Sequence, residues 1–141
     1  NATIPMGATI VQDYIYESML ENADAPIELF HGYTYSGHPV ACAAALATLD
    51  IYKEEGLFEH AGEQAPKIEK AAHSLKGTKH VIDIRNLGVI AAIELEPRGN
   101  AVGARGFEVM KKAWDLGLMV RANGDTLAFS PPLIVSDAQI D

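Results

Sequence analysis

The 141-residue sequence is poor in cysteine and in basic residues, and it lacks any long hydrophobic run. Its one cysteine, Cys42, cannot form an internal disulfide or a thiolate zinc site, which favours a reducing, cytoplasmic location. Eleven lysines and arginines stand against 19 aspartates and glutamates, giving a formal net charge of −8. This balance argues against nucleic-acid binding and against binding to an anionic membrane surface. No apolar run reaches the roughly 20 residues of a membrane-spanning helix.

Signatures of hydrolytic, nucleotide-binding and metal-dependent enzymes are also missing. The sequence has no Gly-x-Ser-x-Gly elbow and no Walker loop. Its five histidines do not follow the HExxH spacing, so we expect no metal site. The carboxylates at Glu54, Glu55, Glu94 and Glu96 have no convergent partner, and we assign them no catalytic role.

Enough apolar sequence is present to build a folded core. Hydrophobic residues make up 48% of the chain, whose length is typical of one compact domain. Apolar periodicity and turn residues predict strands over 7–11, 81–85, 89–95, 118–121 and 126–129, and helices over 12–23, 39–55, 57–75 and 106–116. Pro39 suits the first turn of its helix, and Asn123-Gly124 predicts a hairpin turn. This order predicts an α/β architecture that passes into α+β.

One face of the predicted helix over 39–55 carries only small side chains: Ala41, Cys42, Ala43, Ala44, Ala45 and Ala47. Small side chains allow another backbone to approach closely. We therefore expect this helix to be buried against partners.

The two ends of the sequence indicate a piece of a longer protein. The first residue is Asn1 rather than an initiator methionine. Ser136 and Gln139 have the spacing of a capping box, which predicts the start of a helix. The sequence nevertheless stops at Asp141, two residues later. Because so short a helix is not stable alone, we expect the natural chain to extend further.

The loop over 31–39 is the most informative stretch for function. Thr34, Ser36 and the flexible Gly37 come just before a predicted helix N-terminus. Free backbone N–H groups and the helix dipole make such a place suitable for a phosphate. The alternative is structural, with Ser36 acting as an ordinary N-cap of the helix.

Arg121 is the second candidate binding residue. It stands at the end of a predicted apolar strand, next to the Asn123-Gly124 turn. A guanidinium there can bind a carboxylate through two parallel hydrogen bonds. The alternative is a surface arginine that forms an ion pair with Asp125.

Taken together, four segments resemble the class III pyridoxal-phosphate-dependent aminotransferases. They are Pro5-Met6-Gly7-Ala8, the loop His31 to Ala41, the Arg85-Asn86-Leu87-Gly88 turn with its following strand, and Gly117 to Arg121. The Thr-Tyr-Ser-Gly-His-Pro loop is the specific signal, and the other segments support it. The likeness covers nearly the whole chain and is strongest to the omega-amino-acid:pyruvate (beta-alanine:pyruvate) branch.

The resemblance implies a fragment of a fold type I enzyme. Residues 1–55 would be the end of the large cofactor-binding domain with its connecting helix. Residues 56–141 would be most of the small α+β C-terminal domain, with its last helix truncated. The family also implies a homodimer with shared active sites.

Residue roles follow from the same resemblance. Thr34, together with Ser36, would bind the phosphate of pyridoxal 5'-phosphate in the neighbouring subunit's site, and Arg121 would receive a substrate carboxylate. The family's cofactor-binding lysine stands a few residues before the Pro-Met-Gly segment, and none of the seven lysines here matches it. We therefore assign no catalytic residue to this chain and expect it to be inactive alone.

The resemblance implies transfer of an amino group from an omega-amino acid or amine to pyruvate or a similar keto acid. Two alternatives remain open. One is another class III enzyme, such as an aminomutase or a diamine or ornithine-type transaminase. The other is a non-catalytic dimerisation or interaction domain.

Overall fold

The computed structural model describes residues 4–23 and 34–141, in two compact units, Asn1–Ile51 and Tyr52–Asp141. His31, Gly32 and Tyr33 of the loop predicted to bind phosphate lie outside the described residues. No helix in the described ranges is long and apolar enough to cross a membrane.

Helices α1 (Asp13–Glu21) and α2 (Pro39–Glu54) confirm two sequence predictions. Helix α2 begins at the expected proline, and Gly56 follows its end with a positive φ of 57°. The strand predicted over 7–11 is wrong, because these residues have no regular structure and Ile10 is 95% exposed. A strand needs a neighbour to pair its backbone groups, and no described segment pairs with this one.

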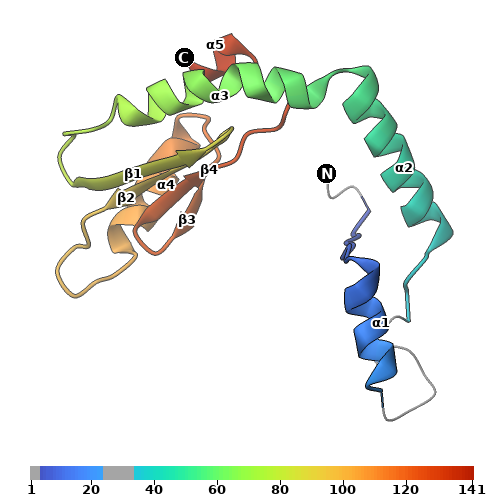
Figure 1. The fold of residues 1–141 in the computed structure, drawn as a ribbon. Coiled ribbons are helices and arrows are strands. Elements are labelled where there is room, and N and C mark those ends of the chain that lie inside the picture. The colour runs from blue at the N-terminus through green and yellow to red at the C-terminus, as the bar shows by residue number, and fades with distance from the viewer. Residues whose placement is uncertain (1–3, 24–33) are drawn as a thin grey trace. The chain divides into compact units, whose positions relative to one another are not determined.

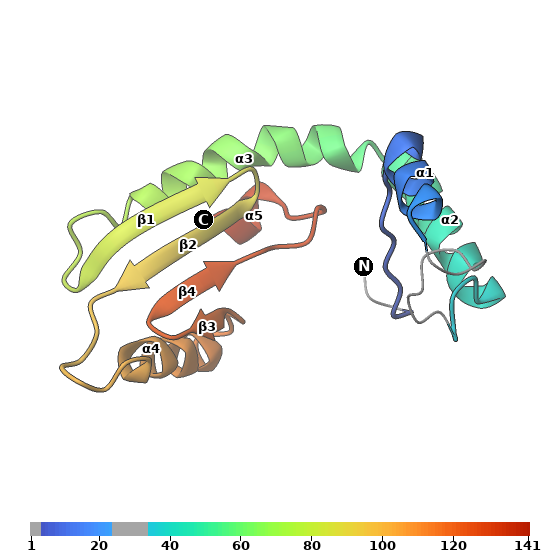
Figure 2. The same ribbon diagram turned by 60° about the horizontal axis from the view of Figure 1, so that its bottom comes forward.

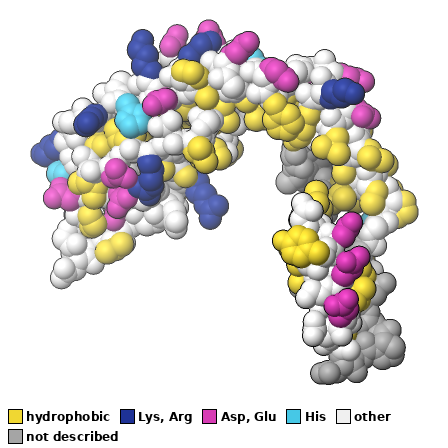
Figure 3. All heavy atoms as spheres, viewed as in Figure 1, with side chains coloured by type: hydrophobic (Ala, Val, Ile, Leu, Met, Phe, Trp, Pro, Cys, Tyr) yellow, Lys and Arg dark blue, Asp and Glu magenta, His cyan; other side chains and the backbone are white. Residues whose placement is uncertain are grey.

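Helix α2 exposes much of its apolar surface. Ala41 is its only buried residue, while Val40, Leu46 and Leu49 are each at least 59% exposed. Figure 3 shows hydrophobic side chains gathered over this helix. Burial of the small face against partners therefore stays a prediction.

The second unit is an antiparallel sheet with helices packed on it. Its elements are α3 (Leu57–His73), β1 (Val81–Leu87), β2 (Ile90–Leu95), α4 (Ala104–Asp115), β3 (Arg121–Asn123), β4 (Thr126–Phe129) and α5 (Asp137–Ile140). The strand order is β1-β2-β4-β3, with every neighbouring pair antiparallel. Helix α3 contacts β1 and β2, whereas α4 contacts β3 and β4, as Figures 1 and 2 show.

Alternation along the strands gives the sheet one covered and one open face. Under α3, Ala91 of β2 packs in a cluster with Ile68 and Ala72 of the helix and with Val135, which follows β4. Towards α4, it forms a second cluster of Ile93, Leu95 and Leu127, onto which Val109 and Met110 pack. Phe129 packs against both clusters. Burying this face drives the folding of the second unit, because apolar area is removed from water.

Both hairpins have two-residue turns. Leu87 pairs with Ile90, so Gly88 and Val89 form the first turn, close to where the sequence predicts it. In the second hairpin, Asn123 pairs with Thr126, which makes Gly124 and Asp125 the turn. The predicted Asn123-Gly124 turn is therefore wrong by one residue, and strand β3 starts at Arg121 rather than at residue 118.

Candidate functional site

Thr34 and Ser36 lie in an exposed turn that precedes α2. Gly37 has a φ of +70°, a conformation that glycine adopts without strain. The carbonyl of His38 accepts the first helical hydrogen bond, from Cys42 N–H at 3.0 Å. Ser36 therefore stands two residues before the N-cap position, and the alternative that it caps the helix is wrong.

The chemistry of this turn fits a phosphate. Thr34 and Ser36 each carry a hydroxyl group, which can donate a hydrogen bond to a phosphate oxygen. The first N–H groups of a helix also lack intrahelical partners, and the helix dipole favours negative charge there. Thr34 and Ser36 therefore remain candidates for binding a phosphate.

Arg121 is the first residue of β3, an edge strand of the sheet. Its neighbour Ala122 packs into the covered cluster, so alternation places Arg121 on the open face, where it is exposed. Ala128 stands opposite Arg121, and Ala92 stands opposite Ala128 on the next strand. These small side chains leave room beside the guanidinium on the open face.

Arg85 lies in the same cross-strand row, opposite Ala92 on β1. Its Nη1 donates to Glu94 Oε2 at 2.8 Å and to Asp83 Oδ2 at 2.7 Å, and both carboxylates raise its pKa, Glu94 more strongly. Arg121 forms no such ion pair with any described residue. Of the two arginines on this face, Arg121 is the one whose donors are available to an incoming carboxylate.

The alternative pairing of Arg121 with Asp125 is wrong, because Asp125 is already engaged. Its Oδ2 accepts from Gly103 N–H at 2.7 Å, and its Oδ1 accepts from Gly106 N–H at 3.0 Å. The side chain is buried, with 7% exposure. These backbone hydrogen bonds, the one from Gly103 first, hold the pKa of the Asp125 carboxyl below its usual value.

Sequence reasoning assigned Asp125 only as a possible ion-pair partner and missed this role. Its donors lie 19 and 22 residues away, at the start of α4. The only signals in the sequence are an acidic residue at a turn and two glycines at the start of a helix, Gly103 at its N-cap and Gly106 in its first turn. Nothing in that spacing says that the turn and the helix meet.

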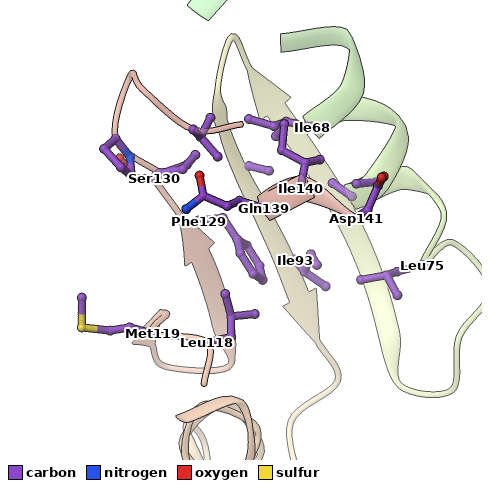
Figure 4. A pocket seen from close by; sticks show the side chains of 16 residues that line it. Ile68, Leu75, Ile93, Leu118, Met119, Phe129, Ser130, Gln139, Ile140 and Asp141 are labelled. Carbon is purple, nitrogen blue, oxygen red and sulfur yellow. The ribbon is translucent and has the colours of Figure 1, made fainter. Parts of the chain in front are cut away.

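A pocket of about 560 Å³ opens between α3, α5 and the covered side of the sheet. Figure 4 shows Ile68, Ile93, Phe129 and Ile140 at its walls. Its polar lining is confined to Ser130, Gln139 and Asp141, and Arg121 does not reach it. In the ranges 4–23 and 34–141, no group of three metal-ligating side chains converges. The candidate binding residues therefore lie elsewhere, on the α2 turn and on the open sheet face.

The comparisons with known proteins define the class to which the chain belongs. The family model for class-III aminotransferases matches residues 2–141. Because this match covers nearly the whole chain, the chain belongs to the class-III aminotransferases, and the resemblance stated from its motifs is confirmed.

Within this family, the chain is similar to omega-amino-acid transaminases. It is 52% identical over 141 residues to an omega-aminotransferase of Caulobacter vibrioides, covering 100% of this chain and 32% of the relative. It is 45% identical over 143 residues to a beta-alanine–pyruvate aminotransferase of Pseudomonas aeruginosa, again covering 100% of this chain and 32% of the relative. The chain thus spans about a third of the length of these curated relatives.

Solved structures confirm the predicted fold. A thermostable omega transaminase variant from Pseudomonas jessenii matches with a TM-score of 0.74 and 39% identity over 80% of this chain and 26% of that one. The P. jessenii omega transaminase in complex with PMP matches with a TM-score of 0.73 over the same shares. The chain therefore has the fold of part of a fold type I transaminase.

Proposed function

We propose that this chain is part of a pyridoxal 5'-phosphate-dependent transaminase. The enzyme moves an amino group from an omega-amino acid or amine to pyruvate or a similar keto acid. Family membership and the likeness to omega-amino-acid transaminases support the proposal. The structural observation that carries it is Arg121, an exposed guanidinium without an ion pair to any described residue on the open face of the sheet.

In this proposal, the chain supplies binding groups rather than the catalytic base. Thr34 and Ser36 donate hydrogen bonds to the cofactor phosphate, and Arg121 binds the carboxylate of the keto acid through its planar fork. The bound cofactor supplies an electron sink for removal of the substrate proton. None of the seven lysines stands in the family position, so the 141-residue chain alone is expected to show no turnover.

The wider organisation is also a proposal. Residues 1–55 belong to the large domain and residues 56–141 to the small domain, which the division near Ile51 supports. The enzyme is a homodimer in which the Thr34 turn serves the neighbouring subunit's site. Exposed apolar residues on α2 support an interface there. The lone Cys42 supports a cytoplasmic location.

The Arg121 role is tested in the full-length enzyme by replacing Arg121 with alanine. Loss of a bidentate contact to a carboxylate costs on the order of 2–4 kcal/mol, or roughly 30- to 1000-fold in specificity constant for pyruvate. The half-reaction with an uncharged amine changes far less, because that substrate has no carboxylate. Single-turnover kinetics measure each half-reaction separately.

Arg85→Ala is the matched control. It removes the same charge from the same row of the sheet, at about 14 Å from Arg121 by three strand spacings. Any effect of Arg85→Ala should be the same for the pyruvate and the amine half-reactions. Arg121→Lys should recover only part of the pyruvate activity that Arg121→Ala loses. Equal losses for both substrate types in Arg121→Ala would refute the carboxylate role.

The Thr34 role has an independent readout, the affinity for the cofactor. Thr34→Ala removes one charge-assisted hydrogen bond, worth about 1.5–3 kcal/mol, so the Kd for pyridoxal 5'-phosphate should rise about 10- to 150-fold. Thr34→Ser keeps the hydroxyl and should retain most of the affinity. Unchanged cofactor affinity in Thr34→Ala would reject the phosphate role.

A further inference from the structure

The N-terminus of α4 and the β3–β4 turn are joined by one carboxylate. Asp125 uses both oxygens, accepting from Gly103 N–H at 2.7 Å and from Gly106 N–H at 3.0 Å. These are groups that a helix N-terminus leaves without intrahelical partners, and here a residue from a distant turn satisfies them. We call this contact the Asp125 clasp.

The glycines of the clasp allow the turn to sit directly on the helix backbone. A Cβ on Gly106 would stand 2.3 Å from the Gly124 carbonyl oxygen and 2.9 Å from Asp125 Cα. Gly103 has a φ of +85°, and its Cβ would meet Gly124 Cα at 3.5 Å. The clasp is therefore a close backbone-to-backbone contact in which side chains have little room to adjust.

Strand β3 depends on this contact for its position. It has only three residues and pairs on one side alone, with β4. Helix α4 contacts it, and Val109 and Met110 of this helix pack on the same cluster as Ala122 of the strand. Arg121 is the first residue of this strand, and the Asp125 clasp holds the turn that follows the strand. A shift of the turn relative to α4 would therefore move the backbone that carries the guanidinium.

We propose that Asp125 is a positioning residue for Arg121, fixing the β3–β4 hairpin on α4 so that the guanidinium is held where a substrate carboxylate binds. This inference rests on the proposed carboxylate role of Arg121. Asp125 itself lies on the helix side of the turn and is committed to Gly103 and Gly106, so it acts through the backbone and does not touch the substrate.

The test is Asp125→Asn in the full-length enzyme. The amide keeps the shape of the side chain, but its NH2 cannot accept a hydrogen bond, so one of the two contacts is lost. The KM for pyruvate should rise about tenfold, less than the roughly 100-fold that a displacement of about 1 Å can cost. The half-reaction with an uncharged amine should change by less than about twofold. Asp125→Ser leaves a single hydroxyl oxygen on a shorter side chain and should give a larger increase in the KM for pyruvate.

Asp137→Asn is the matched control, because it removes another aspartate of the same unit that binds Lys67 rather than α4. It should leave the KM for pyruvate unchanged, and melting temperatures of all variants separate loss of stability from loss of position. Suppose that Arg121→Ala impairs pyruvate selectively, whereas the Asp125→Asn and Asp125→Ser variants slow both half-reactions equally or slow neither of them. That result overturns the positioning role of Asp125 and leaves the carboxylate role of Arg121 standing. If Arg121→Ala itself is not selective, both are overturned.

Discussion

Gly106→Ala tests whether the close contact between α4 and the β3–β4 turn controls the stability of the second unit. Two effects oppose each other. Alanine favours a helix over glycine by about 0.5–1 kcal/mol, because glycine loses more backbone freedom on folding. Against this, the new Cβ would lie 2.3 Å from Gly124 O and 2.9 Å from Asp125 Cα.

The steric effect should win. Both atoms belong to the backbone, so no flexible side chain can move aside, and ordinary carbon contacts lie at about 3.5–4.0 Å. Overpacking a filled site costs about 1–3 kcal/mol, and a contact this short belongs at the upper end. After subtracting the gain in helix propensity, we expect a net loss of about 2 kcal/mol in the free energy of unfolding.

Gly62→Ala provides the opposite case in the same unit. Gly62 lies inside α3, its φ is not positive, and a Cβ there would meet nothing within 4 Å. Here only the propensity term acts, so the substitution should stabilise by about 0.5–1 kcal/mol. Urea denaturation followed by circular dichroism measures both variants against the parent protein. If Gly106→Ala is as stable as the parent, or shifts the midpoint in the same direction as Gly62→Ala, the reasoning is refuted.

Three further substitutions in the second unit have distinct expected outcomes. Because the folded-state pKa of Asp125 is lowered, its linked stability is fully present above the ordinary aspartate pKa of about 3.9 and is lost as pH falls through the lower folded value. Asp125→Asn should flatten this acid dependence of the urea midpoint, and an unchanged profile would contradict the linkage. Ile93→Ala empties a position that is 4% exposed and should cost about 2–5 kcal/mol in urea denaturation, so a loss well below 1 kcal/mol would place Ile93 outside the core. Gly117→Ala forces an L-residue to a φ of +88°, where its Cβ crowds the local backbone although no atom beyond its chain neighbours lies within 4 Å, and should cost about 1–2 kcal/mol. A melting temperature equal to that of the parent would show that the backbone there relaxes freely.

The accuracy of sequence-based prediction in this chain follows the range of the interactions that decide each element. Helices α2 and α4 and the first hairpin depend on local signals, namely Pro39, amphipathic spacing and the glycine at position 88, and all were predicted. The apolar, β-branched run over 7–11 has the composition of a strand but finds no pairing partner in the described structure. Composition alone does not supply that partner.

The candidate site shows the same limit at the level of single residues. The resemblance pointed to Thr34 and Arg121 because their neighbouring residues form recognisable segments. The pattern around Asp125 instead suggested an ion pair with the nearby Arg121, since opposite charges four residues apart at a turn lie within reach. In the fold, two backbone N–H groups about twenty residues earlier bind the carboxylate. A helix N-terminus must find acceptors for its N–H groups, and the glycines at positions 103 and 106 let the turn come close enough to provide them. With Asp125 engaged there, Arg121 is left without the partner that the sequence offered it, and its donors face the open side of the sheet.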